Sequence, residues 1–134
     1  MNILFSERYR YFIYRSACDM RKGYDGLSGI VRGEWKKDPL SGDVFIFLSK
    51  QRNKIKLLHW QNDGFVIYSK RLEKGTFELP KDNSIEISAH QLQFILDGIY
   101  LSSIKKRVRY EHRFVNNNFN ENVFSARRSS IFVT

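Results

Sequence analysis

The stretch DMRKGYDGL, from Asp19 to Leu27, combines two carboxylates, two cations and two glycines, which suits acid–base catalysis, phosphate binding or a helix start. A metal-binding or catalytic carboxylate pair must converge in space. Asp19 and Asp25 are six positions apart, about 600° around a helix, so they do not share a face. A catalytic pair is therefore excluded. We expect Asp19 to cap the helix and Asp25 to place negative charge in its first turn. Phosphate binding at this helix start, beside Arg21 and Lys22, is the alternative.

Other catalytic and metal chemistries find no support in the sequence. Asp38, Asp63 and Asp82 stand next to Pro, Gly or Asn, where turns favour aspartate for backbone reasons. One cysteine and three scattered histidines show no zinc-ligand spacing, and we expect His59 to be a packed or edge residue. No nucleophile elbow or P-loop is present. The sequence predicts a protein without catalytic residues, bound metal or cofactor.

Basic residues carry the strongest functional pattern. The net charge is +9, which favours a polyanionic partner such as nucleic acid. Lys50, Arg52, Lys54 and Lys56 occupy alternate positions, so a continuous strand would project them from one face toward phosphates. For any single lysine, the alternative is the solvated face of a half-buried strand. Further candidate nucleic-acid contacts are Arg8, Arg10, Arg21, Lys22, Lys70 and Arg71.

Aromatic residues interleave with the first of these cations. Tyr9 and Tyr11 alternate with Arg8 and Arg10, a mixture suited to base stacking combined with phosphate contact. The same aromatic richness is typical of a strand, so both interpretations remain open at this point.

The segment from Ser102 to Thr134 differs in character from the rest of the chain. It contains seven basic residues against two acidic ones, and so holds +5 of the total charge, together with the polar run NNNFNEN. We interpret residues 1–101 as a single domain and residues 102–134 as a basic, Asn-rich tail. The tail adds Lys105, Lys106, Arg107 and Arg109 to the candidate nucleic-acid contacts.

The elements that must position these cations follow from periodicity. Residues 8–16 predict a strand, and apolar spacing over 21–35 predicts an amphipathic helix. Three strands then alternate with turns between residues 43 and 71, with Asn62-Asp63-Gly64 as a hairpin signal, and TFELP is predicted to close the series. Ser88 with Gln91 forms a capping-box pattern before a second helix. The predicted fold class is α+β, an antiparallel β-meander of about five strands with two helices packed on one face.

Compartment and membrane association follow from simple counts. Cys18 is the single cysteine and excludes an internal disulfide, which favours a reducing cytoplasm. The apolar start is too short for a signal peptide, and no run could span a bilayer. We expect a cytoplasmic, nucleoid-associated protein without membrane contact.

Several linked motifs together resemble a known family. DMRKGYDGL, DPLSGDVFIF, KIKLLHWQNDGFVIYSKRLEKGTFELP and LQFILDGIYL, in this order, are similar to the accessory protein of the insertion sequence 66 family, the product of its second open reading frame. This protein, often called TnpB, is unrelated to the RNA-guided nuclease of that name. The resemblance covers roughly residues 9–104. His59 departs from it, because the family often has a large apolar residue there, and the tail extends beyond it.

The resemblance implies a role in transposition of a bacterial mobile element, with a separate DDE-type transposase cutting and joining the DNA. The family has no assigned catalytic residues, so no site can be carried over. Positions that match its motifs are candidates only, and they are Asp19, Arg21, Lys22, Asp25, Trp60, Lys70 and Arg71.

The predicted function is therefore a non-catalytic accessory factor for transposition that binds DNA at the element ends by electrostatic docking. The alternative is a protein-interaction module that recruits or regulates the transposase or other element-encoded proteins. That alternative predicts an exposed apolar patch near Trp35 or Trp60. A cryptic nuclease would need three carboxylates meeting in space, and RNA in place of DNA stays open.

Overall fold

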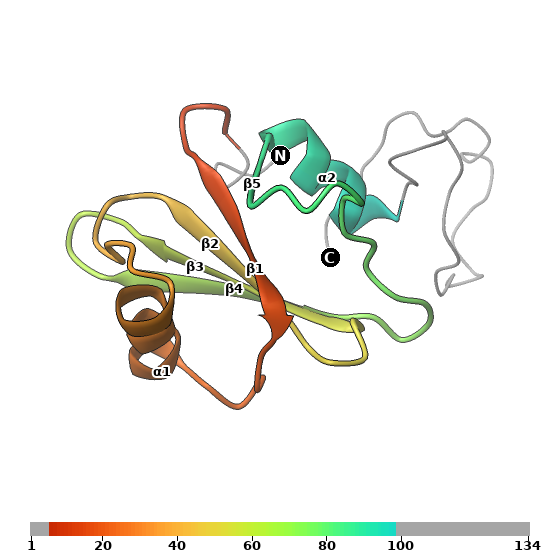
Figure 1. Cartoon of the computed structure of the whole chain (residues 1–134), viewed down its shortest axis with the longest axis horizontal. Coiled ribbons are helices and arrows are strands. Elements are labelled where there is room, and N and C mark those ends of the chain that lie inside the picture. The colour runs from red at the N-terminus through yellow and green to blue at the C-terminus, as the bar shows by residue number, and fades with distance from the viewer. Residues whose placement is uncertain (1–5, 99–134) are drawn as a thin grey trace, which may run out of the picture.

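The computed structural model describes residues 6–98, which form a five-stranded sheet with helices beside it (Figure 1). The sheet is mostly antiparallel, its strand order is β4-β3-β2-β1-β5, and the predicted α+β class is confirmed. The elements are β1 (Tyr11–Ala17), α1 (Tyr24–Gly29), the π-helix η2 (Ile30–Glu34), β2 (Val44–Leu48), β3 (Lys54–Trp60), β4 (Phe65–Arg71), β5 (Glu86–Ile87) and α2 (Ala89–Asp97).

Two local sequence signals, one for a turn and one for a helix cap, are confirmed. The Asn62-Asp63-Gly64 signal forms the β3–β4 hairpin, in which the Gln61 amide donates to the Gly64 carbonyl at 2.8 Å. Asn62 takes the left-handed conformation, with φ 60°, that this turn requires. The Ser88 capping box with Gln91 is also confirmed at the start of α2.

β1 lies parallel to β2, which departs from a pure antiparallel meander. Tyr11 is paired with Val44, and Ile13 with Ile46. Parallel neighbours require a crossover connection, and here α1 and η2 provide it between the two strands. The predicted helix over 21–35 thus exists as α1 and η2 in succession, and its role is to return the chain to the same end of the sheet.

The two helices pack on opposite faces, so the prediction that both share one face was wrong. Successive residues of the central strands enter two different cores. Val44 and Ile46 join the cluster with Leu92 of α2, whereas Phe45 joins the cluster with Leu27 of α1. All five residues of β2 are buried, as expected for a strand covered on both faces. In Figure 1, α1 and α2 accordingly lie on either side of the sheet.

The TFELP segment, residues 76–80, is not a strand, which corrects the predicted meander. Its Phe77 and Leu79 are buried, and this alternation imitates a half-buried strand. The Phe77 amide donates to the Arg52 carbonyl at 2.7 Å, but no ladder with the sheet follows. The fifth strand is instead the short β5, which pairs with β1 in antiparallel orientation.

His59 is a packed residue, as predicted, and it is neutral in the fold. Its side chain is 1% exposed, and its Nε2 lies 3.1 Å from the Gly42 carbonyl oxygen, which can only accept. Gln61 Nε2 lies 3.3 Å from His59 Nδ1, and Tyr9 packs edge-on against the ring. Burial lowers the pKa of His59 below its ordinary value of 6.5, since charge is disfavoured there.

This burial predicts that the protein loses stability in mild acid. Below about pH 6.5 the unfolded chain takes up a proton at His59 that the folded state resists, so the free energy of unfolding falls as pH falls. Urea unfolding at pH 7.5 and pH 5.5 measures the loss. His59→Gln is expected to flatten this dependence, and an unchanged slope in that variant would contradict the assignment. The pKa values of Asp19, Asp82 and Glu86 are lowered in the fold, so these carboxylates affect the free energy of unfolding only in more acidic solution.

Candidate nucleic-acid interface

The turn between β2 and β3 presents the central cations and breaks their predicted alternation. The Arg52 amide donates to the Ser49 carbonyl at 2.9 Å, and the Lys54 amide to the Ser49 hydroxyl at 3.1 Å. Arg52 adopts a left-handed φ of 62°. Lys50 and Arg52 therefore belong to the turn, and only Lys54 and Lys56 share a face of β3. The continuous strand that would project these cations from one face is absent, because the chain reverses among them.

Ion pairs engage three of the predicted nucleic-acid contacts. Arg10 forms a two-pronged pair with Glu86, with both N–O distances 2.9 Å. The other two pairs are Arg21 with Asp19 at 2.8 Å and Arg71 with Glu73 at 3.1 Å. Arginines held by neighbouring carboxylates offer less net charge to a polyanion than unpaired ones do.

Two predicted lysines make structural contacts to backbone carbonyls. Lys56 donates to the Lys22 carbonyl at 2.9 Å and so fastens the segment before α1 to β3. Lys70 donates to the Leu96 carbonyl at 3.2 Å, near the C-terminus of α2, where the helix dipole favours a cation. These side chains serve the fold whatever else they contact.

Four exposed cations remain at the end of the sheet, and we call them the basic rim. The Lys56 bond to the Lys22 carbonyl brings Lys22 to the end of β3 that carries the turn. Among the residues the structure describes, no carboxylate pairs with any of the four. The rim consists of Lys22, Lys50, Arg52 and Lys54.

The opening stretch DMRKGYDGL forms a turn before it forms a helix. Asp19 does not cap α1, and this prediction was wrong. Its carboxylate accepts from the Arg21 amide at 2.9 Å and from the Arg21 guanidinium, an arrangement that also lowers the pKa of Asp19. The N-cap is Gly23, without a side-chain cap, whereas Asp25 lies in the first turn as predicted. Phosphate binding at this helix start stays a prediction.

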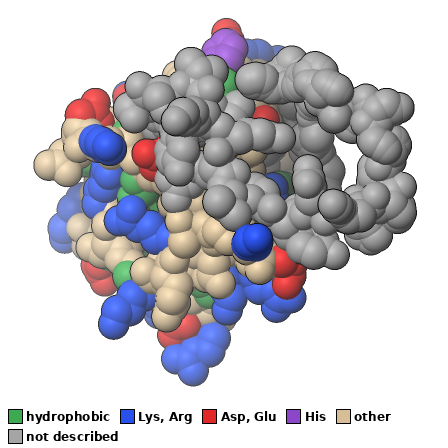
Figure 2. All heavy atoms as spheres, turned by 90° about the vertical axis from the view of Figure 1, so that its right-hand side faces the viewer, with side chains coloured by type: hydrophobic (Ala, Val, Ile, Leu, Met, Phe, Trp, Pro, Cys, Tyr) green, Lys and Arg blue, Asp and Glu red, His purple; other side chains and the backbone are tan. Residues whose placement is uncertain are grey.

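Lys22 of the rim and the neighbouring Lys56 both affect a buried thiol. Burial raises the pKa of the Cys18 thiol, and the charges of Lys22 and Lys56 oppose that rise. Lys22 and Lys56, which are distant from each other in the sequence, therefore both influence the ionisation of this thiol. The β2–β3 turn lies at the right in Figure 1, and Figure 2 shows Lys and Arg side chains gathered on the described part of that side.

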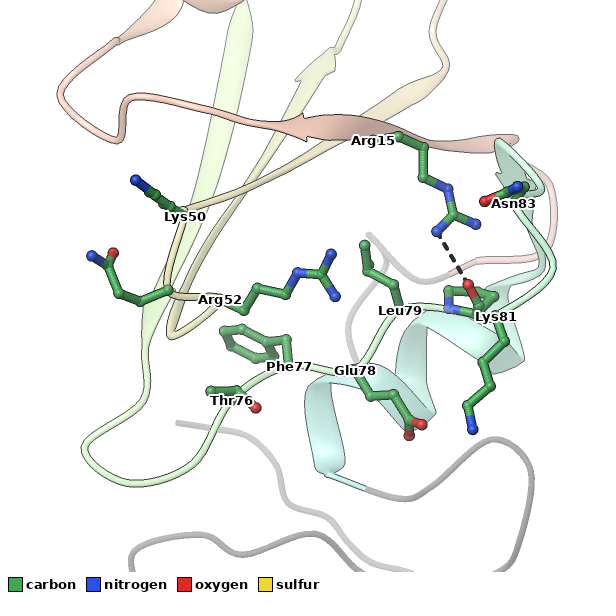
Figure 3. Close-up of a pocket in the computed structure, with 11 residues that line it drawn as sticks. Arg15, Lys50, Arg52, Thr76, Phe77, Glu78, Leu79, Lys81 and Asn83 are labelled. Atoms are coloured by element: carbon green, nitrogen blue, oxygen red, sulfur yellow. Dashed lines mark hydrogen bonds between the residues drawn. The ribbon is translucent and has the colours of Figure 1, made fainter.

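A cavity of about 490 Å³ opens beside the turn, and Figure 3 shows its lining. Arg15 of β1 forms one wall, where its guanidinium donates to the Ser84 carbonyl at 2.6 and 3.0 Å and to the Pro80 carbonyl at 3.1 Å. Arg52 points into the same space from the turn. The remaining lining residues are Lys50, Gln51, Thr76, Phe77, Glu78, Leu79, Pro80, Lys81 and Asn83. The sequence indicated Arg15 only as one of the cations interleaved with aromatic residues, and it did not indicate Lys81, because no local pattern brings either residue to Arg52.

The remaining predicted contacts fall in two groups. Arg8 is exposed just before β1. Lys105, Lys106, Arg107 and Arg109, with the predicted tail at 102–134, lie outside the described residues, so the boundary at residue 101 stays a prediction.

Metal and membrane sites were searched over the same part of the chain. Within residues 6–98 no three His, Cys, Asp or Glu side chains converge as metal ligands, the arrangement that a cryptic nuclease would need. None of the helices there combines the length and hydropathy required of a membrane span.

Comparison with known proteins identifies the family. The model of the IS66 Orf2-like proteins, TnpB_IS66, matches residues 9–106, which is most of the chain. The chain belongs to the IS66 Orf2-like family. Membership implies a role in the transposition of IS66-type insertion sequences, in agreement with the motifs quoted above.

Two curated relatives come from Sinorhizobium fredii (strain NBRC 101917 / NGR234). One, "Uncharacterized protein y4jC", is 27% identical over 100 residues, covering 73% of this chain and 86% of the relative. The other, "Uncharacterized protein y4hO", is 33% identical over 92 residues, covering 67% of this chain and 80% of the relative. No solved structure matches the chain significantly.

Proposed function

We propose that this IS66 Orf2-like protein is a non-catalytic accessory factor that binds DNA during transposition, through the basic rim at one end of its sheet. The observation that carries the proposal is the rim itself. Lys22, Lys50, Arg52 and Lys54 are exposed at one end of the fold, and none pairs with a carboxylate of the described residues. Exposed unpaired cations release counterions from DNA phosphates when they bind.

The distribution of the other cations supports the same surface. Three arginines outside the rim are paired with carboxylates, namely Arg10 with Glu86, Arg21 with Asp19 and Arg71 with Glu73. The four rim cations have no such partner among the described residues, so their charge is available to a polyanion. A concentrated positive field raises the rate of encounter with a polyanion and orients it. The proposed partner is the DNA at the ends of the element.

A salt titration of DNA binding tests this function. The full chain is titrated with a duplex carrying the terminal inverted repeat of its element, and with a scrambled duplex of equal length. We expect affinity to fall steeply as salt rises and to be higher on the repeat. Equal, salt-sensitive binding to both would support a non-specific clamp, with the transposase selecting the site. No binding to either near physiological salt would overturn the DNA proposal and favour the protein-interaction alternative.

The protein-interaction alternative has a narrower structural basis. Trp35 is half-buried, and its contacts with Phe12, Phe45 and Phe47 direct it toward the core beside α1. Trp60 is half-buried and contacts Phe65 at the β3–β4 hairpin. A protein partner would therefore meet this hairpin, at the opposite end of β3 from the rim.

A further inference from the structure

Two guanidinium groups converge on the cavity beside the β2–β3 turn. Figure 3 shows the side chains of Arg15 and Arg52 directed into the same space, whereas the carboxylate of Glu78 points away from both. No ion pair joins either arginine to a carboxylate among residues 6–98. Like charges that share a space repel each other, and an anion placed between them removes that repulsion.

Without a ligand, the fold holds the guanidinium of Arg15 and the backbone of Arg52 in place. Three of the five N–H groups of the Arg15 guanidinium donate hydrogen bonds to the Ser84 and Pro80 carbonyls. The backbone of Arg52 is fixed on both sides, because its amide donates to Ser49 and its carbonyl accepts from Phe77. A prearranged donor such as the Arg15 guanidinium loses little conformational freedom when it binds.

The cavity floor strengthens the attraction for an anion. Phe77, Leu79 and Pro80 are buried there, so the space is bounded by low-dielectric groups on one side. Such walls concentrate the field of the two guanidinium groups. Lys50 and Lys81 stand at the margin with their ammonium groups turned outward in Figure 3, and they add positive charge around the opening.

We propose that this cavity receives one phosphodiester group of the bound DNA, gripped by the guanidinium of Arg52 with Arg15 as second donor. The inference rests on the proposed function and deepens it, because it turns part of the rim from a diffuse charge into a fixed anchor. A guanidinium matches two phosphate oxygens with parallel N–H bonds, whereas an ammonium acts as a point charge. The anchor would define how the duplex lies across the end of the sheet.

A substitution that keeps the charge separates the anchor from simple attraction. Arg52→Lys keeps the net charge and leaves the backbone contacts of residue 52 intact. We expect it to weaken binding of the terminal-repeat duplex roughly tenfold, the order expected when a charge-assisted, two-pronged contact is lost. The slope of log affinity against log salt should change little, because no charge is removed. Arg32→Lys, the same exchange on exposed η2 outside the rim, should bind like the original protein.

Amide spectra locate the contact independently. On addition of the same duplex, ¹H–¹⁵N signals of Thr76 and Asn83, which line the cavity, should shift in the original protein and shift less in Arg52→Lys. If the original protein binds DNA but Arg52→Lys binds equally well and these amides do not move, the anchor is overturned while the proposed function stands. If the original protein binds no DNA, both fail together.

Discussion

Replacing Lys50 and Lys54 by glutamine is expected to weaken DNA binding roughly 10- to 100-fold near physiological salt, the size expected when two phosphate contacts are lost. The slope of log affinity against log salt should become shallower by about 1.8, since each contact contributes about 0.9. Both residues are exposed rim cations, so their loss leaves the cores untouched. Fluorescence anisotropy with a labelled duplex at several salt concentrations measures both quantities.

A variant with the same charge provides the control. Arg32→Gln with Lys36→Gln removes two exposed cations outside the rim. Lys37, next to Lys36, lies 4.1 Å above the Phe12 ring, and Phe12 pairs with Phe45 far from the β2–β3 turn. This control should retain most of the affinity. If both double variants lost affinity equally, net charge alone would explain binding, and the proposal that DNA contacts the rim would be contradicted.

Replacing Phe45 by alanine is expected to lower the free energy of unfolding by about 3–5 kcal/mol, as for other buried aromatic residues cut to alanine. Phe45 is fully buried in β2, between β1 and β3. Its ring lies 5.9 Å from that of Phe12 and 5.5 Å from that of Trp35. Truncation therefore leaves a cavity where α1 and η2 rest on the sheet.

Urea unfolding followed by circular dichroism measures this loss at neutral pH. Phe94→Ala removes the same atoms from α2, where that side chain is 37% exposed. Its cost should be about 1 kcal/mol or less, since partly exposed positions lose little on truncation. Equal losses in the two variants would show that the aromatic cluster under α1 is not a stabilising core.

Sequence patterns predicted one turn and one helix cap that depend on a few neighbouring residues, whereas the cap predicted at Asp19 was wrong. The Asn62-Asp63-Gly64 turn and the Ser88–Gln91 capping box are local, because every atom that makes them lies within four positions. The family was likewise readable from its linked motifs. The TFELP segment shows the limit of such patterns. Alternating burial of Phe77 and Leu79 arises from packing into the core on the α2 side of the sheet, and no periodicity distinguishes that from strand pairing.

The composition of β2 indicates that the sheet is covered on both faces. VFIFL in β2 is apolar at every position, which indicates burial on both faces and hence a covering layer on each side. The cavity could not be predicted in this way. Arg15 comes from β1, Arg52 from a turn and Lys81 from an irregular segment, so only the assembled sheet brings them together.

The parallel pairing of β1 with β2 has a consequence for how the chain folds. β2, β3 and β4 are joined by short turns, so their contacts close small loops and can form early. β1 can pair with β2 only after the crossover has formed. Its pairing with β5 joins residues that are separated by a much longer stretch of chain. Until then, the apolar side chains of Tyr11, Phe12 and Ile13 stand without their partners. We therefore expect the closure of β1 to limit the rate of folding, at a stage when its exposed apolar side chains favour aggregation.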